Sequence, residues 1–173
     1  MLNTILLVSL LTDDRLKQAA REIQEREAPR SFSLIIDSPG GDMKATIDFV
    51  VFLWNAGGPE SQLISGIKIY NADSAAAFIA LAIPTYREMR KGATLGIHRG
   101  SVILEASEFD ADTGVINQET LDRFKQHDAY LKRILDENGL LKDKKLMAEL
   151  YGSGWLHLSA DECLKRGIVK KLF

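Results

Sequence analysis

The chain has 173 residues, of which 46% are hydrophobic and 27% are charged, a composition that excludes a disordered chain and fits one folded domain over 1–173. Its 22 Lys and Arg residues against 24 Asp and Glu residues give a net charge of −2, so no bulk positive charge favours a nucleic acid or an acidic membrane as partner. One cysteine, Cys163, and three histidines exclude an internal disulfide and a cysteine-based metal cluster, and we expect neither a metal nor another cofactor.

The first segment of the chain is apolar and centres on residues 5–10. It is shorter than the ~20 residues that a membrane helix needs. It also lacks the basic start and the small-residue cleavage site of a secretion signal. We therefore expect a buried strand here, no membrane partner and a cytoplasmic protein.

Strands and helices are expected to alternate along the rest of the chain. Further buried strands are predicted at 32–37, 63–70, 93–98 and 168–169. Helices are predicted from an N-cap at Thr12 to Pro29, and at 43–57, 74–83, 117–137, 142–150 and after a capping box formed by Ser159 and Glu162. The stretch 101–114 is acidic and is expected to be an exposed strand and loop. This pattern predicts an α/β fold with short, buried, parallel strands.

The turn Ser38-Pro39-Gly40-Gly41 lies between a predicted strand and a predicted helix. Proline fixes the entry to the turn, and the two glycines let the backbone bend and let another group approach closely. The N–H groups at a helix start carry positive partial charge, so such a turn can bind an oxyanion or a phosphate. A purely structural turn is the alternative.

Ser74 lies at the next junction of strand and helix, and it opens the Ala-rich segment Ala75-Ala76-Ala77. A serine in that place is most often an N-cap. It can also be a nucleophile at a sharp turn, although the surrounding sequence is not G-x-S-x-G.

His98 ends the fourth predicted strand, 24 positions after Ser74. That spacing accommodates a helix, a turn and a strand, so both residues can meet at one edge of the sheet. A serine, a histidine that accepts its proton and two opposing N–H donors are what acyl transfer requires. A buried structural histidine is the alternative.

In this order and spacing, the three segments resemble the Clp protease proteolytic-subunit (ClpP-like) family of serine peptidases. The matching residues are Ile36-Asp37-Ser38-Pro39-Gly40-Gly41, Asp73-Ser74-Ala75-Ala76-Ala77-Phe78 and Gly96-Ile97-His98. The resemblance extends along nearly the whole chain, through Arg87, the helix at 117–137 and the tail at 158–169.

The resemblance implies a ClpP/crotonase-like spiral of β-β-α units, with a protruding handle helix at about 100–140. It implies a serine-type endopeptidase that hydrolyses peptides or unfolded chains inside a homo-oligomer of one ring or stacked rings. Ser74 would be the nucleophile, His98 the base and then the acid, and the N–H groups of Gly41 and Ala75 the oxyanion hole.

Several positions depart from the family pattern. The third catalytic group should be an aspartate, but Trp155 stands at its ungapped position, which leaves Ser153, Glu149 or no residue as the third group. Asp73 replaces the usual alanine before the nucleophile, and a carboxylate there could raise the pKa of His98 or cap the helix. The Gly-rich strand that pairs with substrate is replaced by an acidic stretch. A Clp-type ATPase is a further implied partner, but the family's N-terminal docking loops have no counterpart before residue 5.

Two other functions fit the same fold. The missing aspartate suggests a catalytically silent scaffold or regulatory subunit. A crotonase-type acyl-CoA enzyme would use two backbone N–H groups without a Ser–His pair, but the sequence contains no recognisable adenine-binding segment.

Overall fold

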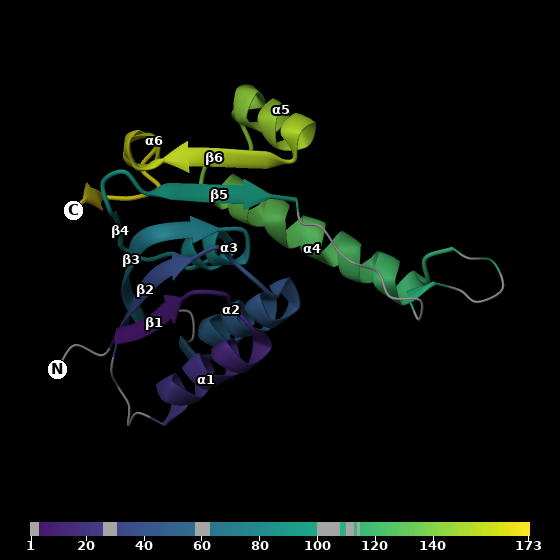
Figure 1. The fold of residues 1–173 in the computed structure, drawn as a ribbon, viewed down its shortest axis with the longest axis horizontal. Helices are drawn as coiled ribbons and strands as arrows, with labels where there is room; N and C mark the ends of the chain where they lie inside the picture. Colours follow the sequence, from purple (N-terminus) through teal and green to yellow (C-terminus); the bar gives the residue numbers. More distant parts are fainter. Residues whose placement is uncertain (1–3, 26–30, 58–62, 100–107, 110–112, 114) are drawn as a thin grey trace.

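The computed structural model describes residues 4–25, 31–57, 63–99, 108–109, 113 and 115–173. In these residues seven strands form one mostly parallel sheet, and helices alternate with them along the chain, which confirms the predicted α/β class (Figure 1). The strands are β1 (Thr4–Val8), β2 (Phe32–Ser38), β3 (Ile64–Asp73), β4 (Arg87–Met89), β5 (Thr94–His98), β6 (Trp155–Ser159) and β7 (Lys171–Leu172). The helices are α1 (Asp13–Gln24), α2 (Met43–Gly57), α3 (Ala75–Ala82), α4 (Gln118–Glu137), α5 (Lys144–Ser153) and α6 (Ala160–Lys165).

The sheet divides at β3, which pairs with two different strands along its length. Its middle pairs in parallel with β4 at Ile67–Ile69, and its end pairs in parallel with β5 at Ala72 and Asp73. One path of the sheet therefore runs β1-β2-β3-β4-β7, while β5 leaves it and pairs with β6. Because β5 branches off at the last residues of β3, the residue after β3 lies close to β5.

Helix α3 is buried on every side, as its composition predicts. All eight of its residues are buried, and five of them are alanines. Small side chains let the helix pack closely between β3, α2 and α4. The backbone at its first turn is thereby held firmly against the end of β3.

Helix α4 is anchored at its C-terminal half, where Leu131, Ile134 and Leu135 are buried. Its N-terminal half extends away from the sheet (Figure 1), and Leu121 and Phe124 there are only half-buried. The predicted bounds of this helix are confirmed to within one residue, with Asn117 as the N-cap that accepts a hydrogen bond from the Thr120 N–H. None of the described helices is long and apolar enough to cross a membrane.

Other local predictions are also confirmed. The Thr12 side chain caps α1 by accepting from the Arg15 N–H, and Ser159 and Glu162 form the expected capping box. Cys163 is buried, and burial raises the pKa of its thiol to about 12, so it is an unreactive core residue.

The predicted strand pattern differs from the observed one in several places. Strands β4, β6 and β7 were missed, and β6 runs antiparallel to β5, so the sheet is not wholly parallel. Residues 168–169 are not a strand, because Ile168 and Val169 donate their N–H groups to Cys163 O and close α6. The first strand stops at Val8, since Ser9 adopts a φ of 61°. Pro29 and most of 101–114 lie outside the described residues.

Candidate active site

The three segments singled out in the sequence meet at one edge of the sheet. The turn 38–41 follows β2, Ser74 follows β3 and His98 ends β5. These three strands pair in parallel as neighbours, so their carboxyl ends share that edge. Ligands usually bind outside the carboxyl ends of parallel strands in open α/β sheets.

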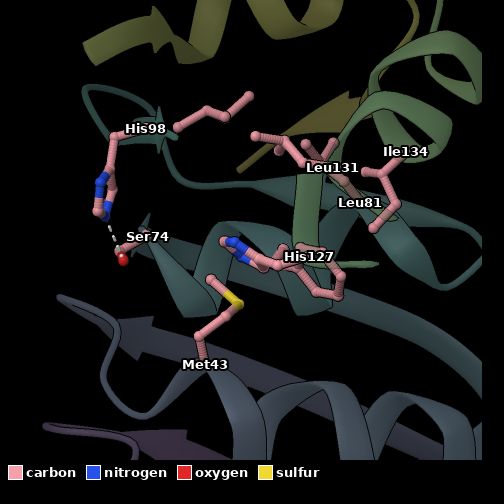
Figure 2. A pocket seen from close by; sticks show the side chains of 9 residues that line it. Met43, Ser74, Leu81, His98, His127, Leu131 and Ile134 are labelled. Atoms are coloured by element: carbon pink, nitrogen blue, oxygen red, sulfur yellow. Dashed lines mark hydrogen bonds between the residues drawn. The ribbon is translucent and has the colours of Figure 1, made fainter. Parts of the chain in front are cut away.

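Ser74 occupies a strained turn between β3 and α3. Its φ of 55° and ψ of −122° are rare for a residue with a side chain, so the surrounding structure must hold them. Its N–H donates to Gly96 O on β5 at 2.7 Å. The side chain makes no N-cap hydrogen bond to α3; instead Ser74 Oγ lies 2.6 Å from His98 Nε2 (Figure 2). The simple N-cap interpretation is therefore wrong, because the hydroxyl is directed to the imidazole.

His98 contacts an indole as well as the hydroxyl. It lies opposite Trp155 in the antiparallel pair β5–β6, and the two rings stack with centroids 4.1 Å apart at 24°. Trp155 stacks in turn on His157, with centroids 5.3 Å apart at 6°. The stacked indole restricts the plane of the His98 ring while its Nε2 faces Ser74.

The electrostatic surroundings favour a neutral His98. Partial burial lowers the pKa of His98, and the neighbouring His127 lowers it further. The carboxylate of Asp73 raises the pKa of His98, as the sequence suggested, but burial and His127 outweigh it. At neutral pH the ring can therefore accept a proton from Ser74.

The two glycines of the turn 38–41 permit its close approach to Ser74. Gly40 has a φ of 99°, and a Cβ there would lie 2.6 Å from Ser74 Cβ and 2.7 Å from Asp73 O. Gly41 has a φ of 154°, and its Cβ would collide with the backbone of Leu11. Both positions thus require glycine, for conformation and for space.

The predicted oxyanion-hole donors are not used elsewhere. Within the part of the chain that the structure describes, neither Gly41 N–H nor Ala75 N–H donates a hydrogen bond. Ala75 is the first residue of α3, where backbone N–H groups have no partner within the helix. Gly41 follows Gly40 and Ala75 follows Ser74 in the chain, so both N–H groups lie next to the Gly40–Ser74 contact.

The sequence left the third catalytic group open, and the structure puts an aromatic ring at the expected place. Trp155 stacks on His98 there, as described above. Ser153 Oγ lies 2.8 Å from Glu149 O and 2.7 Å from Trp155 O, so its hydroxyl is directed to backbone carbonyl groups. The side chain of Glu149 is exposed on α5. Neither residue is placed to support the imidazole.

A small pocket, partly open to solvent, is lined by Ser74 and His98. Six of its nine lining residues are apolar: Met43, Phe78, Leu81, Ile97, Leu131 and Ile134. The ninth is His127 of α4, which the sequence interpretation missed. His127 follows Phe124 by three positions and precedes Leu131 by four, so its place on the apolar stripe of the helix could have revealed it.

Comparison of the chain with models of protein families and with curated proteins finds no match. Among the described residues, no group of three or more His, Cys, Asp and Glu side chains is placed to hold a metal ion. The chemistry of the site therefore has to be argued from its own geometry. A serine hydroxyl bonded to a neutral imidazole, beside two unused N–H donors, can perform nucleophilic acyl transfer.

Proposed function

We propose that this protein is a serine-type endopeptidase resembling the Clp proteolytic subunit. The observation that carries the proposal is the 2.6 Å contact between Ser74 Oγ and His98 Nε2, made by a serine whose own backbone is strained. Strained backbone at a polar side chain is common at active sites, where it directs the reacting group toward the substrate.

In the proposed reaction, Ser74 Oγ attacks the carbonyl carbon of a peptide bond while its proton passes to His98 Nε2. The N–H groups of Gly41 and Ala75 stabilise the oxyanion, and loss of one such donor costs about 2.7–4 kcal/mol in a measured case. The C–N bond then breaks, and His98 returns the proton to the leaving amine. Water, activated by the same imidazole, hydrolyses the Ser74 ester and restores the enzyme.

The arrangement of elements supports the finer fold and assembly that accompany this proposal. The branched sheet and the projecting half of α4 fit a ClpP/crotonase-like spiral with a handle. The half-buried Leu121 and Phe124 on that half would then be covered in an oligomer of rings. Sedimentation of the protein tests this assembly, and adding a Clp-type ATPase to a peptidase assay tests that partner.

The direct test of the peptidase is labelling with a fluorophosphonate, which reacts with activated serines. We expect one label per chain, located at Ser74 by peptide mapping, and no label in Ser74→Ala. Ser153→Ala is the matched control, because that hydroxyl is exposed and bonded to backbone carbonyl groups. Equal labelling of the wild type and Ser74→Ala would refute the proposal.

A catalytically silent scaffold is the second candidate, and the indole at the expected place of the aspartate favours it. This alternative predicts assembly without turnover, even at high protein concentration and with varied peptides. Hydrolysis that depends on Ser74 would reject it. The Ser–His contact gives no support to a crotonase-type acyl-CoA enzyme, which has no need of that pair.

A further inference from the structure

His127 places one polar atom in the otherwise apolar wall of the pocket beside Ser74. Figure 2 shows its imidazole directed from α4 into the pocket, on the side of Met43 and Ser74. Its Nε2 is buried and has no hydrogen-bond partner among the described residues. A buried polar atom without a partner costs free energy, so an occupant that bonds to it would be favoured.

The charge state of His127 limits what that occupant can be. Burial lowers its pKa, and the opposing effect of the adjacent Asp128 is smaller, so the ring is neutral at pH 7. A carboxylate in the pocket would face a neutral ring and apolar side chains. A cation would face the same surfaces, since none of the described residues that line the pocket carries a carboxylate. Both charged classes would lose hydration without gaining an ion pair.

The pocket opens at the nucleophile and is small. It is lined by both Ser74 and His98, so a side chain that enters it comes from a residue beside the bond that Ser74 would attack. Most of the space around its lining residues is open to solvent and the enclosed part is small, so the pocket can receive at most the end of one side chain.

We propose that His127 makes this pocket selective for an uncharged carboxamide side chain, glutamine or asparagine, on the acyl side of the cleaved bond. The methylene groups would lie against Leu131 and Ile134, and the carboxamide would reach His127 Nε2. Because a carboxamide both donates and accepts, it satisfies either tautomer of the neutral ring. This inference rests on the proposed peptidase and names its substrate class.

The test compares peptides that differ only at that residue: Gln, Leu, Glu and Lys. We expect kcat/KM for Gln to exceed that for Leu about 10-fold, the worth of one buried hydrogen bond. Glu and Lys should be cleaved more slowly than Gln. In His127→Phe, which keeps a ring of similar shape, the preference should reverse in favour of Leu. Met43→Leu is the control, because it alters another wall without changing the polar atom, and it should keep the Gln-to-Leu ratio.

A binding measurement tests the same selectivity without turnover. Product peptides ending in Gln or Leu are titrated calorimetrically into Ser74→Ala, with and without His127→Phe. Tighter binding of the Gln product, lost in the double variant, supports the inference. Suppose that Ser74 takes the fluorophosphonate label. If Leu is then preferred to Gln, or if His127→Phe leaves the Gln-to-Leu ratio of kcat/KM unchanged, the inference is wrong while the proposed peptidase activity is supported. If Ser74 is not labelled and no hydrolysis depends on it, the proposed function fails and the inference fails with it.

Discussion

Two of the contacts that His98 makes within the described residues differ in character. On the side of Ser74 it meets a polar contact of 2.6 Å, a strained elbow and two unused N–H donors. On the side of β6 it meets the face of Trp155, with ring centroids 4.1 Å apart. The Ser74 side has the features that the proposed nucleophile requires, whereas on the β6 side an indole stacks on the ring at the position where the resemblance predicts a carboxylate.

This difference distinguishes two tasks in such a site: one is to hold the imidazole in a fixed orientation, and the other is to stabilise its protonated form. A carboxylate performs both, because it fixes the tautomer and stabilises the imidazolium that forms. An indole face restricts the ring plane and attracts a cation only modestly. We therefore expect the reactivity of Ser74 to depend strongly on the residues around its hydroxyl and only weakly on Trp155 of β6.

The largest expected effect comes from removing the imidazole. His98→Ala should lower the rate of fluorophosphonate labelling and of peptide hydrolysis severely, by up to about 10⁶-fold if the pair acts as in a known serine protease. His157→Ala is the matched control, because His157 lies two residues from Trp155 on the same strand and contacts that indole instead of Ser74. If both variants lose similar activity, the contact of His98 with Ser74 has no special role, which contradicts the proposed difference between the two sides of the imidazole.

The second largest effect should come from adding a side chain at Gly40, in the space next to Ser74. Gly40→Ala would place a methyl group 2.6 Å from Ser74 Cβ at a φ of 99°, so the turn or the serine must move. A displacement of about 1 Å can cost about 100-fold in rate. We expect a loss of that order in labelling, together with a destabilisation of about 1–3 kcal/mol in chemical unfolding.

Gly139→Ala separates the conformational effect from the collision. Gly139 has a φ of 70°, but nothing lies within 4 Å of a Cβ there. The Gly139→Ala variant should lose about 1–2 kcal/mol in its free energy of unfolding and keep the labelling rate of the wild type. Normal labelling of Gly40→Ala would show that this turn does not support Ser74.

Replacing the indole should have a smaller effect. Trp155→Leu removes the stack on His98, and we expect labelling to slow about 2- to 30-fold, the range of a cation–π contact of about 0.5–2 kcal/mol. Trp155→Phe keeps an aromatic face and should lose less. Thermal melts of both variants give the control for folding. A loss as large as that of His98→Ala would mean that the reaction depends on Trp155 as strongly as on the imidazole itself.

The sequence was sufficient to predict that Ser74 and His98 lie together, but not that Trp155 of β6 stacks on His98. The direction of parallel strands and the spacing of Ser74 and His98 bring those residues to one edge, which the pattern of buried runs reveals. The Trp155 stack depends on an antiparallel strand of five residues, which alternates buried and exposed positions and was not recognised between a helix and a capping box. His127 was missed because its burial depends on how α4 lies against the pocket, which a sparse apolar stripe does not determine.

The smallest expected effect concerns pH. In the proposed reaction the neutral imidazole is the base, so labelling should rise as pH increases through the pKa of His98. Burial and His127 lower that pKa, which puts the midpoint of the acid limb below the ordinary value of 6.5. Asp73 opposes this shift, so Asp73→Asn should move the midpoint to still lower pH, while His127→Phe should move it upward. Labelling rates between about pH 4 and 8 measure both displacements, on either side of the ordinary histidine pKa. If Asp73→Asn moves the limb upward, the carboxylate acts on the site through structure instead of through charge.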